Sequence, residues 1–368
     1  MVLEVYGHGG DIWTASAQYG VEPERFIDFS ANINPLGPPP GLLDRLREAL
    51  PIVTAYPDPG HRALIAKLAD KLGREEAGFV VGNGAAENMA LALLAAGPKK
   101  VGIVEPCFSE YEALSRQFGA EVVSVRGTEE RAFRAEPEAV QRLIGACDLV
   151  FIGQPNNPNG VQYSREELRS FAEAGERNGS YVIIDEAFID FIPESGRRSL
   201  LDELERYRRL ILVRSMTKFY AIPGLRLGYA VAHPQTARAM RDKQVTWSVN
   251  ALALLAGEIC LEAGSAFEEA TISLVAEQRE RLRQGLEQLG CLTWPGEANF
   301  LLVRLPEGKT AAGVQAALGA RGILVRSCAM YKGLSDRDIR VAVKDESACL
   351  RLLQEMKDVL VLTGGETE

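Results

Sequence analysis

Histidine and paired cysteine are scarce in this sequence. Only 3 of the 368 residues are His, and no two of them stand at the spacing of metal ligands. The six cysteines, at positions 107, 147, 260, 291, 328 and 349, are scattered and form no C-x-x-C pair. We therefore expect no metal site and no disulfide framework. The pattern predicts reduced, mostly buried thiols in a cytoplasmic protein.

Three other features are also absent. No apolar run approaches the ~18 residues that span a membrane. The start, MVLEVYGHGGD, lacks a basic segment followed by an apolar stretch, which argues against a secretory signal. Acidic residues outnumber basic ones by 50 to 41, giving a net charge of −9. This balance disfavours an extensive nucleic-acid face. We expect neither a membrane nor a nucleic acid as partner.

The middle of the chain alternates short apolar runs with longer helical patterns. At 368 residues the length suggests two domains. Short β-rich runs separated by helices predict an α/β fold with a mostly parallel sheet covered on both faces. Strands are predicted at 79–81, 101–104, 121–125, 149–153, 181–185, 210–214 and 228–232, and helices at 62–72, 85–96, 109–118 and 165–178.

A smaller α/β layer is predicted near the C-terminus. A long helical region covers roughly 234–289, and the last eighty residues carry short strands at 300–304, 322–326 and 339–343 between helices at 310–320 and 346–360. We expect a large domain over 45–250. The N-terminal arm, 1–44, joins it through the Pro-rich segment 34–40 and forms the smaller domain together with 251–368.

Polar side chains follow several of the predicted strands. In open α/β sheets ligands bind outside the carboxyl ends of the strands, so these segments should share one edge. The segments that follow strands are GNG at 82–84, EPCF at 105–108, QPNNPNG at 154–160, DEAF at 185–188 and SMTKF at 215–219.

Lys218, Asp185 and Asn157 carry the chemistry expected at that edge. A lone lysine is usually a solvated surface charge, but Lys218 lies in an apolar setting that would lower its pKa, as an imine-forming nucleophile requires. A carboxylate such as Asp185 often caps a helix, yet it could also hold a pyridine nitrogen protonated. Asn157 could donate to the phenolate oxygen of the same ring, although Asn-Pro is also a common turn.

The sequence also contains candidate phosphate-binding residues. GNG leads from a strand into the helix at 85–96, whose free N–H groups could cradle a phosphate. Ser215 offers a hydroxyl, and Arg226 offers a planar fork. Phe108 could stack on a cofactor ring, although an apolar residue at a strand end is more often core. Because the pattern is not G-x-G-x-x-G, a dehydrogenase is disfavoured.

Together these motifs carry a resemblance to a known family. SMTKFYAIPGLRLGY at 215–229, QPNNPNG, DEAFIDF and GNG resemble fold-type I pyridoxal-phosphate enzymes of the aminotransferase family. Within them, GHGGDIW at 7–13, FSANINPLG at 29–37, WSVNALALLAGE at 247–258 and ILVRSCAMYKGL at 323–334 are similar to threonine-phosphate decarboxylases. Those enzymes serve cobalamin biosynthesis and are closely related to histidinol-phosphate aminotransferases.

The resemblance implies a role for each cofactor-site residue. Lys218 would form the Schiff base with pyridoxal 5'-phosphate, Asp185 would pair with the pyridinium, and Asn157 would contact the ring. Phosphate contacts are implied for Ala85, Ala86, Ser215 and Arg226. Tyr56 would be contributed across a homodimer interface.

Substrate contacts are implied near both ends of the chain. They fall on His8, Gly9, Asn32, Asn157, Arg326 and Arg340. A phosphorylated amino acid such as L-threonine O-3-phosphate presents a phosphate and a carboxylate, which two arginine forks could bind. The sequence does not assign each arginine to one anion, and both could simply pair with surface acids.

Two reactions stay open within this family. The expected one is decarboxylation of L-threonine O-3-phosphate to (R)-1-amino-2-propanol O-2-phosphate and CO₂. The alternative is amino transfer, as in a histidinol-phosphate aminotransferase. Phe188 stands where the family frequently has a ring-binding tyrosine, which favours decarboxylation slightly. The sequence also contains two motifs of penicillin-recognising serine enzymes, S-x-x-K at 215–218 and S-x-N at 248–250. The third motif of that class, K-T-G, is missing, which argues against this assignment.

Overall fold

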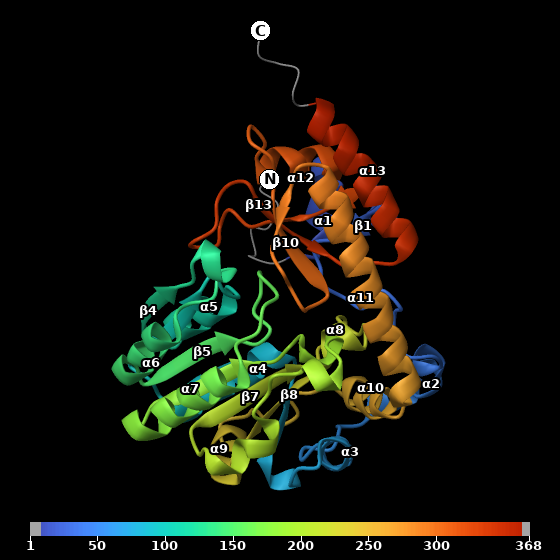
Figure 1. Cartoon of the computed structure of the whole chain (residues 1–368). Coiled ribbons are helices and arrows are strands. Elements are labelled where there is room, and N and C mark those ends of the chain that lie inside the picture. Colours follow the sequence, from blue (N-terminus) through green and yellow to red (C-terminus); the bar gives the residue numbers. More distant parts are fainter. Residues whose placement is uncertain (1–8, 363–368) are drawn as a thin grey trace.

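A seven-stranded sheet forms the centre of the larger part of the molecule (Figure 1). The computed structural model describes residues 9–362. The strand order is β2 (Phe79–Gly82), β8 (Gly228–Ala232), β7 (Leu210–Ser215), β6 (Tyr181–Asp185), β5 (Leu149–Gly153), β3 (Lys100–Glu105) and β4 (Glu121–Arg126). Only β8 runs antiparallel to its neighbours. The predicted mostly parallel α/β sheet is confirmed.

Successive residues of these strands alternate between two apolar layers. Ile183 and Phe151 belong to the layer that contains side chains of α4 (Ala85–Ala96), α5 (Glu110–Gln117) and α9 (Pro234–Arg241). Ile184 and Ile152 belong to the layer that contains side chains of α3 (Arg62–Leu72), α6 (Pro137–Ala146), α7 (Arg165–Asn178) and α10 (Ala251–Leu261). Because both faces are covered, the inner strands are largely apolar, which is why short runs without alternation identified them; the edge strand β4 has no buried residue.

Local signals set several helix ends. Ser164 accepts from the backbone N–H of Glu167, whose side chain bonds back to the Ser164 N–H, so a capping box starts α7. Left-handed glycines, Gly73 and Gly97, follow α3 and α4. The remaining helices are α1 (Ile12–Tyr19), α2 (Leu42–Glu48), α8 (Met216–Phe219), α11 (Gly264–Gln288), α12 (Ala311–Gly319) and α13 (Glu346–Leu362).

A second group of strands lies above the large sheet in the view of Figure 1. An antiparallel sheet has the order β12 (Arg326–Ser327), β13 (Asp338–Ala342), β10 (Phe300–Arg304) and β9 (Leu292–Thr293). A separate parallel pair joins β1 (Ile27–Asp28) to β11 (Ile323–Leu324). The prediction of one strand over 322–326 is therefore wrong. Its first half pairs with the N-terminal segment, and Arg326 turns to pair with β13.

The long helix α11 runs along the smaller group of strands and extends down to α8, where its Phe267 meets Phe219 (Figure 1). The helical region predicted over 234–289 divides into α9, α10 and α11. Polar contacts also join the two groups. Lys332 Nζ lies 3.0 Å from a Glu105 carboxylate oxygen at the end of β3, and Arg304 Nη1 lies 2.6 Å from Glu129. The domain boundaries at 44/45 and 250/251 stay a prediction.

The cysteines and the surface agree with the composition. All six thiols are free and buried, as predicted.

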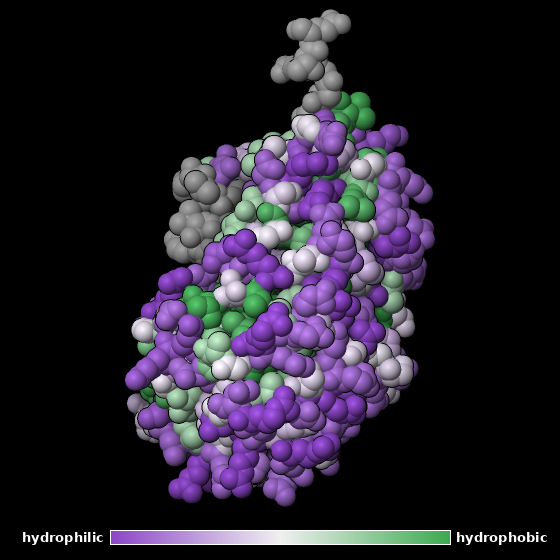
Figure 2. Space-filling view, turned by 60° about the vertical axis from the view of Figure 1, so that its left-hand side comes forward, coloured by the Kyte–Doolittle hydropathy of each residue, from purple (hydrophilic) through white to green (hydrophobic). Residues whose placement is uncertain are grey.

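The face shown in Figure 2 is predominantly hydrophilic, with small hydrophobic patches. Within residues 9–362, no helix combines the length and the apolar character needed to cross a bilayer.

Asn34 ties three distant segments together. Its side-chain nitrogen donates to the Phe219 carbonyl at 2.7 Å and to the Thr271 hydroxyl of α11 at 3.0 Å. Its side-chain oxygen accepts from the Leu36 N–H at 3.0 Å, and its own N–H donates to the Lys218 carbonyl. The N-terminal arm is therefore fixed to α8 and α11 by one buried amide.

We predict that Asn34→Ala lowers the free energy of unfolding by about 2–3 kcal/mol. The substitution removes three side-chain hydrogen bonds and leaves buried partners unsatisfied. Gln288→Ala, at an exposed position near the end of α11, should change it by less than about 0.5 kcal/mol. Urea unfolding of both variants gives the change in the free energy of unfolding. Equal changes in the two variants would show that the hydrogen bonds of Asn34 do not stabilise the fold.

Candidate active site

The carboxyl ends of β2, β3, β5, β6 and β7 lead into the residues predicted to act. Asp185 ends β6 and Ser215 ends β7, and these strands are hydrogen-bonded neighbours. Lys218 follows on α8, one turn after Ser215. Residues separated by more than 100 positions thus share one edge of the sheet, where ligands bind in open α/β folds.

Lys218 is a partly buried amine next to Ser215 and close to Asp185. Its Nζ lies 3.3 Å from Ser215 Oγ. Burial lowers the pKa of Lys218 to about 8, assisted by the positive charges of Arg226 and Arg340 and opposed by Asp185. The amine therefore begins to lose its proton about two pH units below an ordinary lysine, whose pKa is about 10.4. A neutral amine is the form that attacks a carbonyl carbon.

Asp185 is a buried carboxylate with two protein donors. Tyr111 donates its hydroxyl hydrogen to Oδ2 at 2.6 Å, and the Ala187 N–H donates to Oδ1 at 3.1 Å. Burial raises the pKa of Asp185, and these two bonds together with Lys218 act in the opposite direction. Tyr111 was not among the predicted site residues. Its position three residues after Phe108, at the start of a predicted helix, was the available signal.

The start of α4 forms an anion cradle with Arg226. Gly84 precedes Ala85 and Ala86, the first residues of α4, whose N–H groups have no partner within the helix. A Cβ on Gly84 would lie 2.8 Å from Arg226 Nη2, so the guanidinium sits against the glycine. Arg226 adopts a left-handed backbone, with φ of 58°, a conformation that costs energy in a residue with a side chain.

Glycine is also required behind this cradle. Gly228 pairs with both Gly82 of β2 and Ser215 of β7. A Cβ at Gly228 would lie 2.6 Å from the Ala85 nitrogen and 2.9 Å from the Arg214 carbonyl oxygen. Only glycine lets the start of α4 approach the strand ends this closely. Helix N–H groups, an arginine fork and a serine hydroxyl together fit a phosphate group.

Asn157 is held by Arg340. Arg340 Nη1 donates to Asn157 Oδ1 at 2.7 Å, and Nη2 donates to the Ser30 carbonyl. The guanidinium lies over the Phe300 ring, 5.5 Å from its centroid, and Phe188 packs edge-on against the same ring at 5.0 Å. Phe188 thus contributes an apolar surface here and no hydroxyl.

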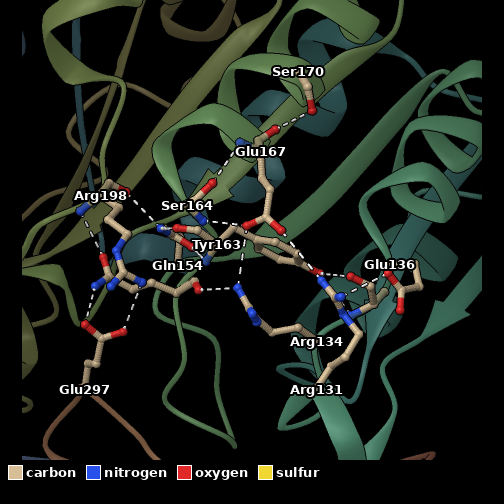
Figure 3. Close-up of polar contacts among 12 residues, drawn as sticks. Arg131, Arg134, Glu136, Gln154, Tyr163, Ser164, Glu167, Ser170, Arg198 and Glu297 are labelled. Carbon is tan, nitrogen blue, oxygen red and sulfur yellow. Dashed lines mark hydrogen bonds and ion pairs between the residues drawn. The ribbon is translucent and has the colours of Figure 1, made fainter.

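A polar network fixes the loop that carries Asn157. Gln154 donates to the Tyr163 and Arg198 carbonyls and accepts from the Tyr163 N–H, which closes the loop upon itself (Figure 3). Asn156 donates to the Pro106 carbonyl at 2.8 Å, which joins this loop to the segment before Phe108. The loop is therefore held by hydrogen bonds both to itself and to the segment that follows β3.

Arg326 and Arg340 lie directly opposite each other on β12 and β13. Both residues are buried, with exposed fractions of 1% and 5%. Arg326 Nη2 lies 3.0 Å from Met330 Sδ. Directly opposed residues of antiparallel strands project to the same face, so two positive charges gather on one side of the sheet. Such a pair favours a ligand with negative charge.

The N-terminal residues approach the same place. Asn32 is buried, and its Oδ1 has no hydrogen-bond partner among residues 9–362. Gly9 lies so near Ser30 that a Cβ would stand 2.2 Å from its carbonyl oxygen, and Gly10 N donates to Ser30 Oγ. Because Ser30 also accepts from Arg340, the arm and the arginine share one anchor. His8 lies outside the described residues.

Two predicted residues are placed differently from the rest. Phe108 is partly buried and meets Tyr111 edge-on, at 5.7 Å between centroids. Tyr56 is 78% exposed, and its ring stacks on Trp247 at 4.2 Å. Within one chain, no contact in the described structure joins Tyr56 to the other site residues. Over residues 9–362, no three His, Cys, Asp or Glu side chains are grouped to hold a metal ion.

We predict that labelling of Lys218 by pyridoxal increases with pH with a midpoint near 8. The apo-protein is mixed with the aldehyde from pH 6 to 10 and reduced with borohydride, and the adduct at Lys218 is quantified by mass spectrometry. Labelling of the exposed lysines should still increase above pH 9, since their ordinary pKa is about 10.4. A Lys218 midpoint above 9.5 would contradict the lowered pKa.

Gly228→Ala should destabilise the fold and the cradle together. The added methyl meets backbone atoms that have little freedom to move, a clash that typically costs about 1–3 kcal/mol. Gly224→Ala is the matched control, because nothing lies within 4 Å of a Cβ there. Thermal unfolding and pyridoxal-phosphate affinity are compared. The steric argument fails if both variants behave alike.

Comparisons with known proteins agree with this geometry. The family described as aminotransferase class I and II matches residues 24–356. A threonine-phosphate decarboxylase of Salmonella typhimurium is 38% identical over 98% of each chain. A bifunctional adenosylcobalamin biosynthesis protein of Leptospira interrogans is 31% identical, over 96% of this chain and 41% of that one.

A solved structure shows the same fold. The histidinol-phosphate aminotransferase of Clostridium acetobutylicum superimposes with a TM-score of 0.84 at 32% identity, covering 91% of this chain and 99% of that one. The family resemblance predicted from the motifs is thereby confirmed. This chain belongs to the aminotransferase class I and II family.

Proposed function

We propose that this protein decarboxylates L-threonine O-3-phosphate with pyridoxal 5'-phosphate as cofactor. The product is (R)-1-amino-2-propanol O-2-phosphate. The observation that carries the proposal is the buried pair Arg326 and Arg340, opposed on β12 and β13 and linked through Asn157 to the edge with Lys218. Two arginine forks suit a substrate with both a phosphate and a carboxylate. The 38% identity to a threonine-phosphate decarboxylase supports the same substrate.

The residues of the sheet edge fit the cofactor. The cradle of Ala85, Ala86, Ser215 and Arg226 suits its phosphate, and the buried carboxylate of Asp185 suits its pyridine nitrogen. Lys218 offers the amine for its aldehyde, and Asn157 and Phe108 would contact the ring. When bound, pyridoxal phosphate supplies a protonated ring that accepts the electron pair left on the substrate.

The chain's own groups would then select the bond that breaks. Arg326, Arg340, Asn32 and Gly9, with His8, would hold both anionic ends of the substrate and so set the orientation of its carboxylate bond. The Cα–carboxylate bond breaks, CO₂ departs, and a proton replaces it on Cα. Lys218 would donate that proton from its amine, and the carboxylate of Asp185 would pair with the pyridine nitrogen of the cofactor.

The proposal includes a cytoplasmic homodimer that serves cobalamin biosynthesis. The similarity to an adenosylcobalamin biosynthesis protein supports the pathway. The free, buried cysteines are consistent with a reducing compartment. The exposed ring of Tyr56, with exposed Leu50, Val53 and Trp247, offers an apolar surface to a second copy. Tyr56 of one copy would then complete the cofactor site of the other.

Amino transfer is the competing function. The structural likeness to a histidinol-phosphate aminotransferase supports it. The lysine, aspartate and cradle do not distinguish the two reactions, because both need them. The two differ in the substrate bond that breaks: decarboxylation breaks Cα–C, and amino transfer breaks Cα–H. Only the decarboxylation releases CO₂.

We expect labelled CO₂ and aminopropanol phosphate when the protein and cofactor meet carboxyl-labelled L-threonine O-3-phosphate. Lys218→Ala should lose turnover by about 10²–10⁴-fold, the scale of a positioned acid–base group. Histidinol phosphate with 2-oxoglutarate is the parallel assay. Amino transfer without CO₂ release would overturn the proposal in favour of the aminotransferase.

A further inference from the structure

Tyr111 is a buried phenol that reaches the carboxylate of Asp185. It lies on the first turn of α5 and is 1% exposed. Its ring stacks on Phe151 of β5, with centroids 4.9 Å apart and planes inclined by 5°, and Phe108 meets it edge-on. The aromatic contacts leave the ring little freedom to rotate, so the hydroxyl is aimed at Oδ2 by packing.

The two donors to Asp185 come from different elements. Tyr111 of α5 bonds Oδ2, and the Ala187 N–H after β6 bonds Oδ1. Two bonds to two oxygens fix the plane of the carboxylate. Each ionised oxygen keeps a further lone pair, so the group can still accept from other donors.

The carboxylate needs such a donor to stay ionised. Burial favours the neutral acid and raises the pKa of Asp185, while the Tyr111 bond is the largest opposing influence. The charged or titratable groups described around the pair are Lys218, next to Asp185, and Cys107, next to Tyr111. Burial and the Asp185 charge raise the pKa of Tyr111 well above its usual value, so the phenol stays protonated and donates.

We infer that Tyr111 is a positioning residue that keeps Asp185 ionised and directs its free lone pair toward the cofactor's pyridine nitrogen. The inference rests on the proposed cofactor. A weaker donor at position 111 makes Asp185 more basic, and the shared proton then moves from the ring nitrogen toward the carboxylate. The ring withdraws electrons less strongly, and the chemical step slows.

Tyr111→Phe tests this with the ring volume preserved. Tyr207→Phe is the matched control, because Tyr207 is also a buried tyrosine but lies before β7, at the opposite end of that strand from Ser215. We expect Tyr111→Phe to lower kcat about tenfold to a hundredfold, the loss of one hydrogen bond to a charged group, with KM within about threefold. Tyr207→Phe should leave both constants unchanged.

A spectroscopic readout separates this role from packing. The absorbance of the bound cofactor is titrated with pH in the holoenzyme. A protonated ring lowers the pKa of the nitrogen that joins the cofactor to Lys218. In Tyr111→Phe the ring is less protonated, so this pKa, and with it the midpoint of the absorbance titration, should be higher. Replacing Tyr111 with 3-fluorotyrosine, a more acidic and stronger donor, should move the midpoint downward and restore kcat.

The outcomes are distinct. Opposite shifts in the phenylalanine and fluorotyrosine variants support the inference. A midpoint that stays at the wild-type value in both variants, or that moves equally in Tyr207→Phe, overturns it. If Tyr111→Phe fails to fold, the fluorotyrosine protein is the test. A downward shift of its absorbance midpoint supports the inference, and an unchanged or higher midpoint overturns it. Wild-type protein that binds no cofactor instead overturns the proposed function.

Discussion

The removal of charged groups from water is the constraint on which this site depends. Lys218, Asp185, Arg326 and Arg340 are all buried or partly buried at the meeting of two sheets. Each would be more stable in solvent, so each needs neighbours that compensate its desolvation. Asp185 is supported by two donors, whereas burial, assisted by the nearby arginines, lowers the pKa of Lys218 and so favours its neutral form.

The two groups of strands contribute different halves of this arrangement. The parallel sheet collects the groups for the cofactor, because its strands all end at one edge. The antiparallel sheet contributes two arginines from a single cross-strand pair. The bond between Arg340 and Asn157 joins the halves, so the groups that we propose for substrate and for cofactor belong to one connected network. Such a connection would hold the two sets of groups in a fixed relative position.

Much of the fold was predictable because its signals are local. All seven strands of the large sheet were predicted to within one or two residues, since buried runs between helices identify them directly. The segment 322–326 was assigned to one strand because its division between two sheets depends on pairing with residue 27 and residue 340. Sequence spacing carries no information on such distant partners.

The candidate site divides in the same way. Lys218, Asp185 and Asn157 could be identified because each directly follows or ends a recognisable strand. For Tyr111 the only signal in the sequence is its place at the start of a predicted helix, because its role depends on the direction of its side chain and on its stacking against Phe151. The sequence around Tyr56 likewise does not show that its side chain is exposed within one chain, because exposure depends on how distant segments pack.

The buried amide of Asn34 has a consequence for the order in which a nascent chain matures. Its partners, Phe219 and Thr271, are 185 and 237 residues further along the chain, and Arg340 emerges later still. During synthesis residues 79–232, which hold all seven strands of the large sheet, therefore emerge before Thr271 and Arg340. A ribosome-bound chain that ends near residue 260 would contain Asn34, Lys218 and Phe219 but would lack the Thr271 partner of Asn34 and the Arg340 partner of Asn157. The network that joins the two groups of strands is complete only when residue 340 has been translated.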